Sequence, residues 1–95
     1  MKQPCVYILA SKRNGTLYVG VTSNLIQRVW QHQQGVIDGF SALYDVKRLV
    51  WYEQHESMET AIQREKQIKA GSRARKIALI EGRNSQWLDL YDEIV

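Results

Sequence analysis

The sequence has almost none of the residues on which disulfide-bonded, zinc-binding and membrane-spanning proteins depend. Its 95 residues include one cysteine, Cys5, which cannot form an internal disulfide and offers no Cys/His zinc spacing. The apolar run from Cys5 to Leu9 falls far short of the roughly 20 residues that a membrane span needs. The first residues lead directly into a strand-like segment, so we expect no signal peptide. These absences predict a cytoplasmic protein with no membrane association.

The chain also lacks the compositional bias of disordered, fibrous or multidomain proteins. Hydrophobic residues make up 44% and charged residues 24%, which are ordinary values for a globular protein. The single proline, Pro4, precedes the first expected strand and interrupts nothing. Because no internal repeat or interdomain linker is visible, residues 1–95 are predicted to form one domain with one modest core.

The excess of positive charge is small and unevenly distributed. The chain has 13 Lys and Arg residues against 10 Asp and Glu residues, for a net charge of +3. In the segment from Arg64 to Lys76, every charged residue except Glu65 is basic. Two interpretations remain open, because such a cluster either binds the phosphates of a nucleic acid or forms a solvated helix face. The residues assigned to nucleic-acid binding are Lys66, Lys69, Arg73, Arg75 and Lys76.

Hydrophobic periodicity and turn residues predict the element order ββαβααα. Strands are expected over residues 5–11, 17–22 and 47–54, where β-branched and aromatic residues are concentrated. Helices are expected over 24–34, 58–70, 72–81 and 85–91. Thr22 or Ser23 would cap the first of these helices, and residues 35–45 would form a polar loop.

The dipeptide Asn14-Gly15 predicts a β-hairpin between the first two strands. A type I′ turn needs positive φ at both central residues, which Asn-Gly tolerates well. A two-residue turn at this point pairs Tyr7 with Thr22 and places Tyr7, Tyr18 and Gly20 on one face of the sheet. Gly20 would then leave a hollow between two phenols. The alternative is that both tyrosines belong to the core or to an interface.

The first helix carries a cation and an imidazole at helical spacing. Arg28 and His32 are four residues apart, so they project from the same side of the helix, beside its apolar stripe. Together they provide the groups that would hold a phosphate. The alternative is a solvated arginine and a histidine at the boundary of the core.

The second helix has an acid on its apolar face. Glu65 lies four residues after Ala61 and three before Ile68, within the stripe that should face the core. A carboxylate in that position is costly unless it is paired or binds a metal. Metal ligation, an ion pair with Arg28 or another base, and a buried stem with a hydrated head group all remain open.

Two phenols, an arginine, a histidine and a half-buried glutamate together suit a phosphodiester site. A metal would polarise the phosphate or bind the leaving oxygen, and arginine would balance the charge of the transition state. A phenol or an imidazole would take the proton of the attacking water. Because tyrosine has an ordinary pKa of about 10, His32 is the better-placed base.

Five short segments combine into one recognisable series. They are Cys5-Val6-Tyr7, Tyr18-Val19-Gly20, the T-x-x-L-x-x-R-x-x-x-H segment from Thr22 to His32, the A-x-x-x-E-x-x-x-K segment from Ala61 to Lys69, and Asn84 to Leu90. In order and spacing this series resembles the GIY-YIG nuclease family, in particular its small stand-alone members, over about residues 4–90. Cys5-Val6 replaces Gly-Ile of the first motif, and Ser85 replaces a proline of the last one.

The resemblance implies an α+β fold in which helices flank a small three-stranded antiparallel sheet. It also implies a metal-dependent endonuclease that uses one divalent ion, Mg²⁺ or Mn²⁺, with Glu65 as the ligand. Arg28 would contact the scissile phosphate. Tyr7 would act as base or orient the water, with His32 sharing the proton. Tyr18 would support Tyr7 or position the phosphate, and Gly20 and Asn84 would help to shape the site.

One small domain with a net charge of +3 has little surface for reading bases. We therefore expect recognition of branched, flapped or damaged DNA by shape, as in DNA repair, with RNA not excluded. A protein partner or a weak homodimer would add binding surface. The alternative function is a nucleic-acid-binding module with little turnover alone, dependent on a partner protein.

Overall fold

The computed structural model describes residues 3–36, 39 and 43–95 and confirms the predicted fold class and element order. The sheet contains strands β1 (Cys5–Ala10), β2 (Leu17–Thr22) and β3 (Arg48–Gln54). The helices are α1 (Leu25–Gln34), α3 (Met58–Ala70), α4 (Arg73–Arg83) and the short α5 (Tyr91–Ile94). The polar loop expected over 35–45 falls partly on residues 37–38 and 40–42, which lie outside the described residues.

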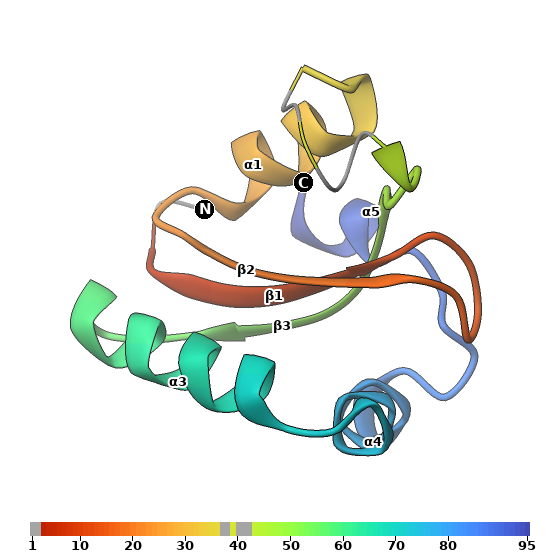
Figure 1. Cartoon of the computed structure of the whole chain (residues 1–95). Helices are drawn as coiled ribbons and strands as arrows, with labels where there is room; N and C mark the ends of the chain where they lie inside the picture. Colours follow the sequence, from red (N-terminus) through yellow and green to blue (C-terminus); the bar gives the residue numbers. More distant parts are fainter. Residues whose placement is uncertain (1–2, 37–38, 40–42) are drawn as a thin grey trace.

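The three strands form an antiparallel sheet in the order β2-β1-β3, with β1 in the centre. All six residues of β1 are buried, because helices cover both faces of the sheet. Figure 1 shows α1 and α5 on one face and α3 and α4 on the other. Side chains alternate along a strand, so Val6, Ile8 and Ala10 pack with α3 and α4, whereas Cys5, Tyr7 and Leu9 pack with α1 and α5.

The β1–β2 hairpin differs from the predicted one in its turn and its register. Tyr7 pairs with Gly20 rather than with Thr22, so the register is displaced by two residues. The turn is longer than two residues, because Ser11 N donates to Thr16 O at 3.0 Å, and within it Asn14 alone has the left-handed φ of 58°. A shift of two residues leaves every side chain on the same face. The predicted common face of Tyr7, Tyr18 and Gly20 is therefore correct.

The three longer helices begin at polar capping residues, as predicted, although the cap of α1 lies at a different residue. The N-cap of α1 is Asn24, whose side chain accepts from Gln27 N, so the prediction of Thr22 or Ser23 was wrong by one or two residues. Ser57 and Ser72 cap α3 and α4 through the backbone N–H three residues on. Within the described ranges, none of the helices is long and apolar enough to cross a bilayer.

The predicted helix over 85–91 is wrong, because the chain there forms an irregular segment and α5 begins only at Tyr91. Trp87 has a left-handed φ of 57° and is fully buried, which is incompatible with a continuous helix. The side chain of Asn84 hydrogen-bonds both to β3 and to the backbone within this segment. Its Nδ2 donates to Val50 O at 3.1 Å and to Leu88 O at 2.8 Å, and its Oδ1 accepts from Leu88 N.

Candidate active site

Tyr7, Tyr18 and His32 form a cluster on the α1 face of the sheet. The Tyr7 hydroxyl lies 3.1 Å from Nε2 of His32, and both residues are buried. Ring centroids are 5.1 Å apart for Tyr18 and His32 and 6.2 Å apart for Tyr7 and Tyr18. The structure thus brings together three of the predicted site residues, from β1, β2 and α1.

Gly20 makes room for this cluster. A Cβ atom built on Gly20 would lie 2.4 Å from the Tyr7 hydroxyl oxygen and 2.5 Å from the carbon that bears it. The phenol head therefore lies directly over the glycine backbone, where any other residue would displace it. The hollow predicted at Gly20 exists, and the ring of Tyr7 fills it.

Burial sets the protonation states of the two hydrogen-bonded groups. The pKa of His32 falls from 6.5 to about 4, first because burial disfavours the imidazolium and second because Arg28 repels it. The pKa of Tyr7 rises above its ordinary value, first because of burial and then because of neighbouring Tyr18, although Arg28 opposes the rise. At neutral pH both groups are uncharged. The hydroxyl of Tyr7 can then donate to Nε2 of a His32 tautomer protonated at Nδ1.

Arg28 provides an exposed positive charge beside the buried cluster. It lies one helical turn before His32 on α1, and its charge acts on the pKa values of both Tyr7 and His32. None of the described residues forms a side-chain hydrogen bond or an ion pair with its guanidinium. An exposed guanidinium with no internal partner is suited to bind an anion, and a phosphate can accept two of its N–H groups.

Glu65 comes from the other side of the sheet. It lies on α3, which packs against β2 and β1, and only 14% of its side chain is exposed. Its carboxylate forms an ion pair with Lys69, one helical turn later, in which Oε2 lies 2.7 Å from Nζ. The ion pair with Arg28 considered above does not form among the described residues, and the partner is Lys69 instead. The charge of Glu65 nevertheless contributes to the raised pKa of Tyr7.

The donor set around Glu65 suits a weakly held hard cation. In the described part of the chain, no three His, Cys, Asp or Glu side chains gather as a ready-made metal cage. Mg²⁺, however, is commonly held by one or two carboxylates together with substrate phosphates and water. A single half-buried carboxylate fits that pattern, and it would have to exchange Lys69 for the metal.

The basic cluster of α3 and α4 is partly occupied by internal contacts. Arg73 donates to the carbonyls of Asn14 and Gly15 in the hairpin turn, at 2.8 and 2.7 Å. Lys76 donates to the carbonyls of Lys69 and Gly71 at the end of α3. Of the five residues assigned to nucleic-acid binding, Lys66 and Arg75 are exposed and have no side-chain partner in the described ranges.

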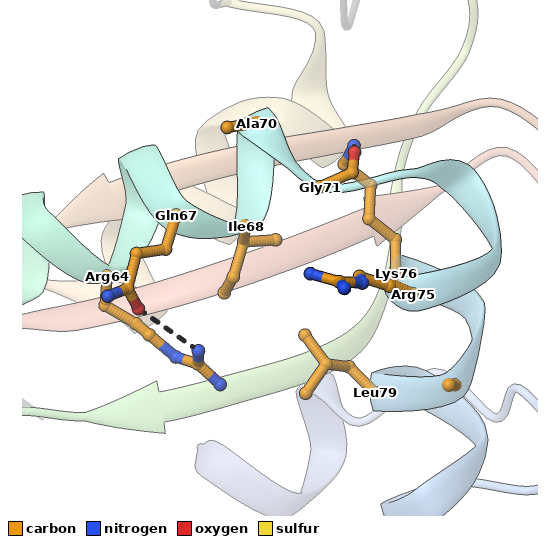
Figure 2. Close-up of a pocket in the computed structure, with 9 residues that line it drawn as sticks. Arg64, Gln67, Ile68, Ala70, Gly71, Arg75, Lys76 and Leu79 are labelled. Carbon is orange, nitrogen blue, oxygen red and sulfur yellow. Dashed lines mark hydrogen bonds between the residues drawn. The ribbon is translucent and has the colours of Figure 1, made fainter.

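A groove of about 730 Å³ lies between α3 and α4, on the face of the sheet opposite to the tyrosine–histidine cluster. Figure 2 shows Ile68 and Leu79 facing each other across it, with Arg75 and Lys76 at one end and Arg64 at the other. Arg64 forms an ion pair with Glu53, in which Nε lies 3.2 Å from Oε1. This groove is thus remote from Tyr7, His32 and Arg28, and we place the site at the cluster because geometry and charge converge there.

Asn84 is not brought to the cluster. Its side-chain hydrogen bonds go to Val50 of β3 and to the backbone of Leu88, so it joins the C-terminal segment to the sheet and supports the fold there. The contact that sequence reasoning missed is Lys69 with Glu65. The i, i+4 spacing of an acid and a base along one helix was the signal that would have found it.

Comparisons with known proteins identify the family and the fold of the chain. The profile of the GIY-YIG catalytic domain matches residues 3–78. A UPF0213 protein from Natronomonas pharaonis is 39% identical over 75 residues, or 79% of this chain and 87% of the relative. Another from Syntrophus aciditrophicus is 38% identical over 85 residues, or 85% and 93%. The solution NMR structure of a UPF0213 protein from Bacillus halodurans superposes with a TM-score of 0.57 at 26% identity, with 92% of each chain covered.

Proposed function

Because the chain belongs to the GIY-YIG family, a family of nucleases, we propose that it is a metal-dependent endonuclease hydrolysing phosphodiester bonds in DNA. One observation carries the proposal: the buried Tyr7–His32 hydrogen bond lies beside Arg28, whose guanidinium forms no hydrogen bond or ion pair with any of the described residues. A purely structural pair would not need an exposed cation next to it.

Arg28 binds the scissile phosphate in this proposal. Its guanidinium is exposed, and its position one turn from His32 puts a bound phosphate close to the Tyr7–His32 pair. Charge that grows on the phosphate oxygens in the transition state would be balanced there. A bound phosphate would also offset the repulsion of Arg28 on the imidazolium, which would make His32 a stronger base.

Tyr7 and His32 share the proton of the attacking water. The raised pKa of Tyr7 keeps it a phenol at neutral pH, so it orients the water rather than deprotonating it unaided. His32 is neutral at that pH and is hydrogen-bonded to the phenol. A proton can therefore pass from the water to Tyr7 while the Tyr7 proton passes to Nε2. Tyr18 packs against both rings and keeps them in place.

Glu65 would hold the divalent ion, Mg²⁺ or Mn²⁺, that the proposed reaction needs. The ion supplies Lewis-acid stabilisation of the phosphate when bound. The carboxylate is an oxygen ligand of the kind these ions prefer, and its small exposed fraction keeps it fixed on α3.

We further propose that the enzyme selects DNA by shape. A net charge of +3 and the internal use of Arg73 and Lys76 leave few cations for a long duplex footprint. Branched, flapped or damaged DNA presents its phosphates in a compact arrangement that a small surface can cover. A protein partner or a weak dimer would extend that surface.

The second candidate is a nucleic-acid-binding module with little turnover of its own. The Lys69–Glu65 ion pair favours it, because the proposed metal ligand is already neutralised in the free protein. Such a module would bind flapped DNA in a salt-sensitive way without cutting it.

A cleavage assay separates the two candidates. Labelled duplex, single-stranded, flapped and branched DNA, with an RNA control, would be incubated with Mg²⁺ or Mn²⁺. Glu65→Gln would be compared with Glu59→Gln, which makes the same charge change at an exposed site on the same helix. The endonuclease proposal expects metal-dependent cutting that only Glu65→Gln abolishes. Binding without cutting by the wild type would favour the module instead.

A further inference from the structure

We propose that Lys69 is an internal cation that occupies Glu65 in the free protein and exchanges partners during the reaction. When a divalent ion is bound at Glu65, the ammonium group of Lys69 would leave the carboxylate and bind a phosphate of the nucleic acid instead. This inference rests on the proposed function, because it takes Glu65 as the metal ligand. It gives Lys69 the role of a positioning residue for substrate and metal.

The ion pair is short and asymmetric. Lys69 Nζ lies 2.7 Å from Oε2 of Glu65, with 14% of the glutamate side chain and 53% of the lysine side chain exposed. The carboxylate is thus held in a fixed place, and leaving it without a counter-charge would be costly. Lys69 supplies that counter-charge when no metal is present.

The lysine side chain can leave while its backbone stays. The carbonyl of Lys69 accepts a hydrogen bond from Lys76 Nζ at 3.3 Å, and the residue lies in the last turn of α3. The helix end therefore does not need to move. Lysine has a flexible four-carbon stem and no fixed donor geometry, so its head group can rotate into solvent at little cost.

The exchange would connect metal binding to substrate binding. A divalent ion brings more charge to the carboxylate than an ammonium group, and the displaced ammonium adds one positive charge to the surface next to Lys66. Metal and DNA then favour each other's binding. When Lys69 contacts a phosphate, its ammonium group no longer competes with the metal ion for the carboxylate of Glu65. By linkage this coupling acts equally in both directions.

Manganese binding tests the first half without any catalytic turnover. The bound fraction of Mn²⁺ would be followed by electron paramagnetic resonance for the wild type, Lys69→Gln and Lys66→Gln. Lys66→Gln is the matched control, because it removes the same charge from an exposed residue of α3 that forms no ion pair within residues 3–36, 39 and 43–95. We expect Lys69→Gln to bind Mn²⁺ about two- to fivefold more tightly than the control, the range of measured surface ion pairs.

Salt-dependent DNA binding tests the second half. With Ca²⁺ present, Lys69→Gln should lower the slope of log affinity against log salt by about one, as expected for the loss of one phosphate contact. Without metal the same variant should leave the slope unchanged, because Lys69 is then held by Glu65. Lys66→Gln should act alike under both conditions.

The outcomes separate this inference from the function on which it rests. Equal Mn²⁺ affinities for the two lysine variants, with binding that Glu65→Gln abolishes, would overturn the exchange and leave the metal site intact. An equal change of the salt slope with and without metal would overturn it as well. Mn²⁺ binding that Glu65→Gln does not affect would overturn the metal assignment and the exchange together.

Discussion

The buried imidazole of His32 should make the fold sensitive to mild acid. Its pKa is 6.5 in an unfolded chain and about 4 in the folded one, because burial and Arg28 both disfavour the charged form. Between these two values the unfolded state binds more protons than the folded state. The free energy of unfolding therefore rises with pH across this window. The contribution of His32 to stability is fully present above pH 6.5 and is lost as the pH falls toward 4.

The size of the loss follows from the two pKa values. Each unit between the folded and unfolded pKa corresponds to about 1.4 kcal/mol, so a separation of roughly 2.5 units gives about 3 kcal/mol. His32 is 2% exposed, so solvent screening reduces this number little. A loss of that size is a large part of the total stability of a domain of this length, about 5–15 kcal/mol.

Urea unfolding between pH 7 and pH 4 measures the effect. Acidic residues also contribute to acid unfolding, so the informative quantity is the difference between the wild type and His32→Gln, which should change by about 3 kcal/mol across the window. His55→Gln is the control, because His55 bonds Glu53 and Thr60 outside the cluster. Parallel stability curves for wild type and His32→Gln, or an NMR titration of His32 near pH 6.5, would refute the reasoning.

Three further results are expected. Gly20→Ala should destabilise the fold by about 1–3 kcal/mol and abolish cleavage, since its Cβ would collide with the Tyr7 phenol, whereas Gly82→Ala, where a Cβ meets nothing within 4 Å, should do neither. Arg28→Gln should raise the pKa of His32 in an NMR titration by less than burial lowers it. Asn84→Ala should lower the free energy of unfolding by about 2–4 kcal/mol in urea, because it removes three hydrogen bonds.

The sequence predicted the secondary structure well wherever one face of an element is apolar. The first two strands, the three longer helices and their order came from period and capping residues, and the structure confirms them within one or two residues. The prediction that Tyr7 and Tyr18 share a face of the sheet was also correct, although the predicted register was wrong. The error was two residues, and side-chain orientation repeats every two residues along a strand.

The prediction failed where a single side chain overrides local preference. Residues 85–90 contain no strong helix breaker, yet the amide of Asn84 takes the backbone groups of Leu88 that a helix would use internally. The buried position of Trp87 then fixes a left-handed backbone. Asn84 also donates to Val50 O, and Arg48 donates to Trp87 O, so β3 fixes this segment from more than 30 residues earlier. Such tertiary contacts are not visible in the local sequence pattern.

The site was predicted as a set of residues rather than as an arrangement. Nothing in the spacing of Tyr7 and His32 along the chain indicates that their polar atoms lie 3.1 Å apart. The partner of Glu65 was left open as Arg28 or another base, and the structure shows that it is Lys69, one helical turn away. Charge alone does not say which cations are used internally, as Arg73 and Lys76 are.

The central position of β1 has a consequence for the motions of the site. This strand is paired with both neighbours from Cys5 to Ala10 and is buried along its whole length, so its amide hydrogens should exchange with solvent only when the entire domain unfolds. Tyr7 is therefore carried by the slowest-exchanging strand of the protein. Arg28 and Glu65 are carried by outer helices, so in the proposed complex we expect any adjustment to a nucleic acid to be made by these helices rather than by the strand that holds the phenol.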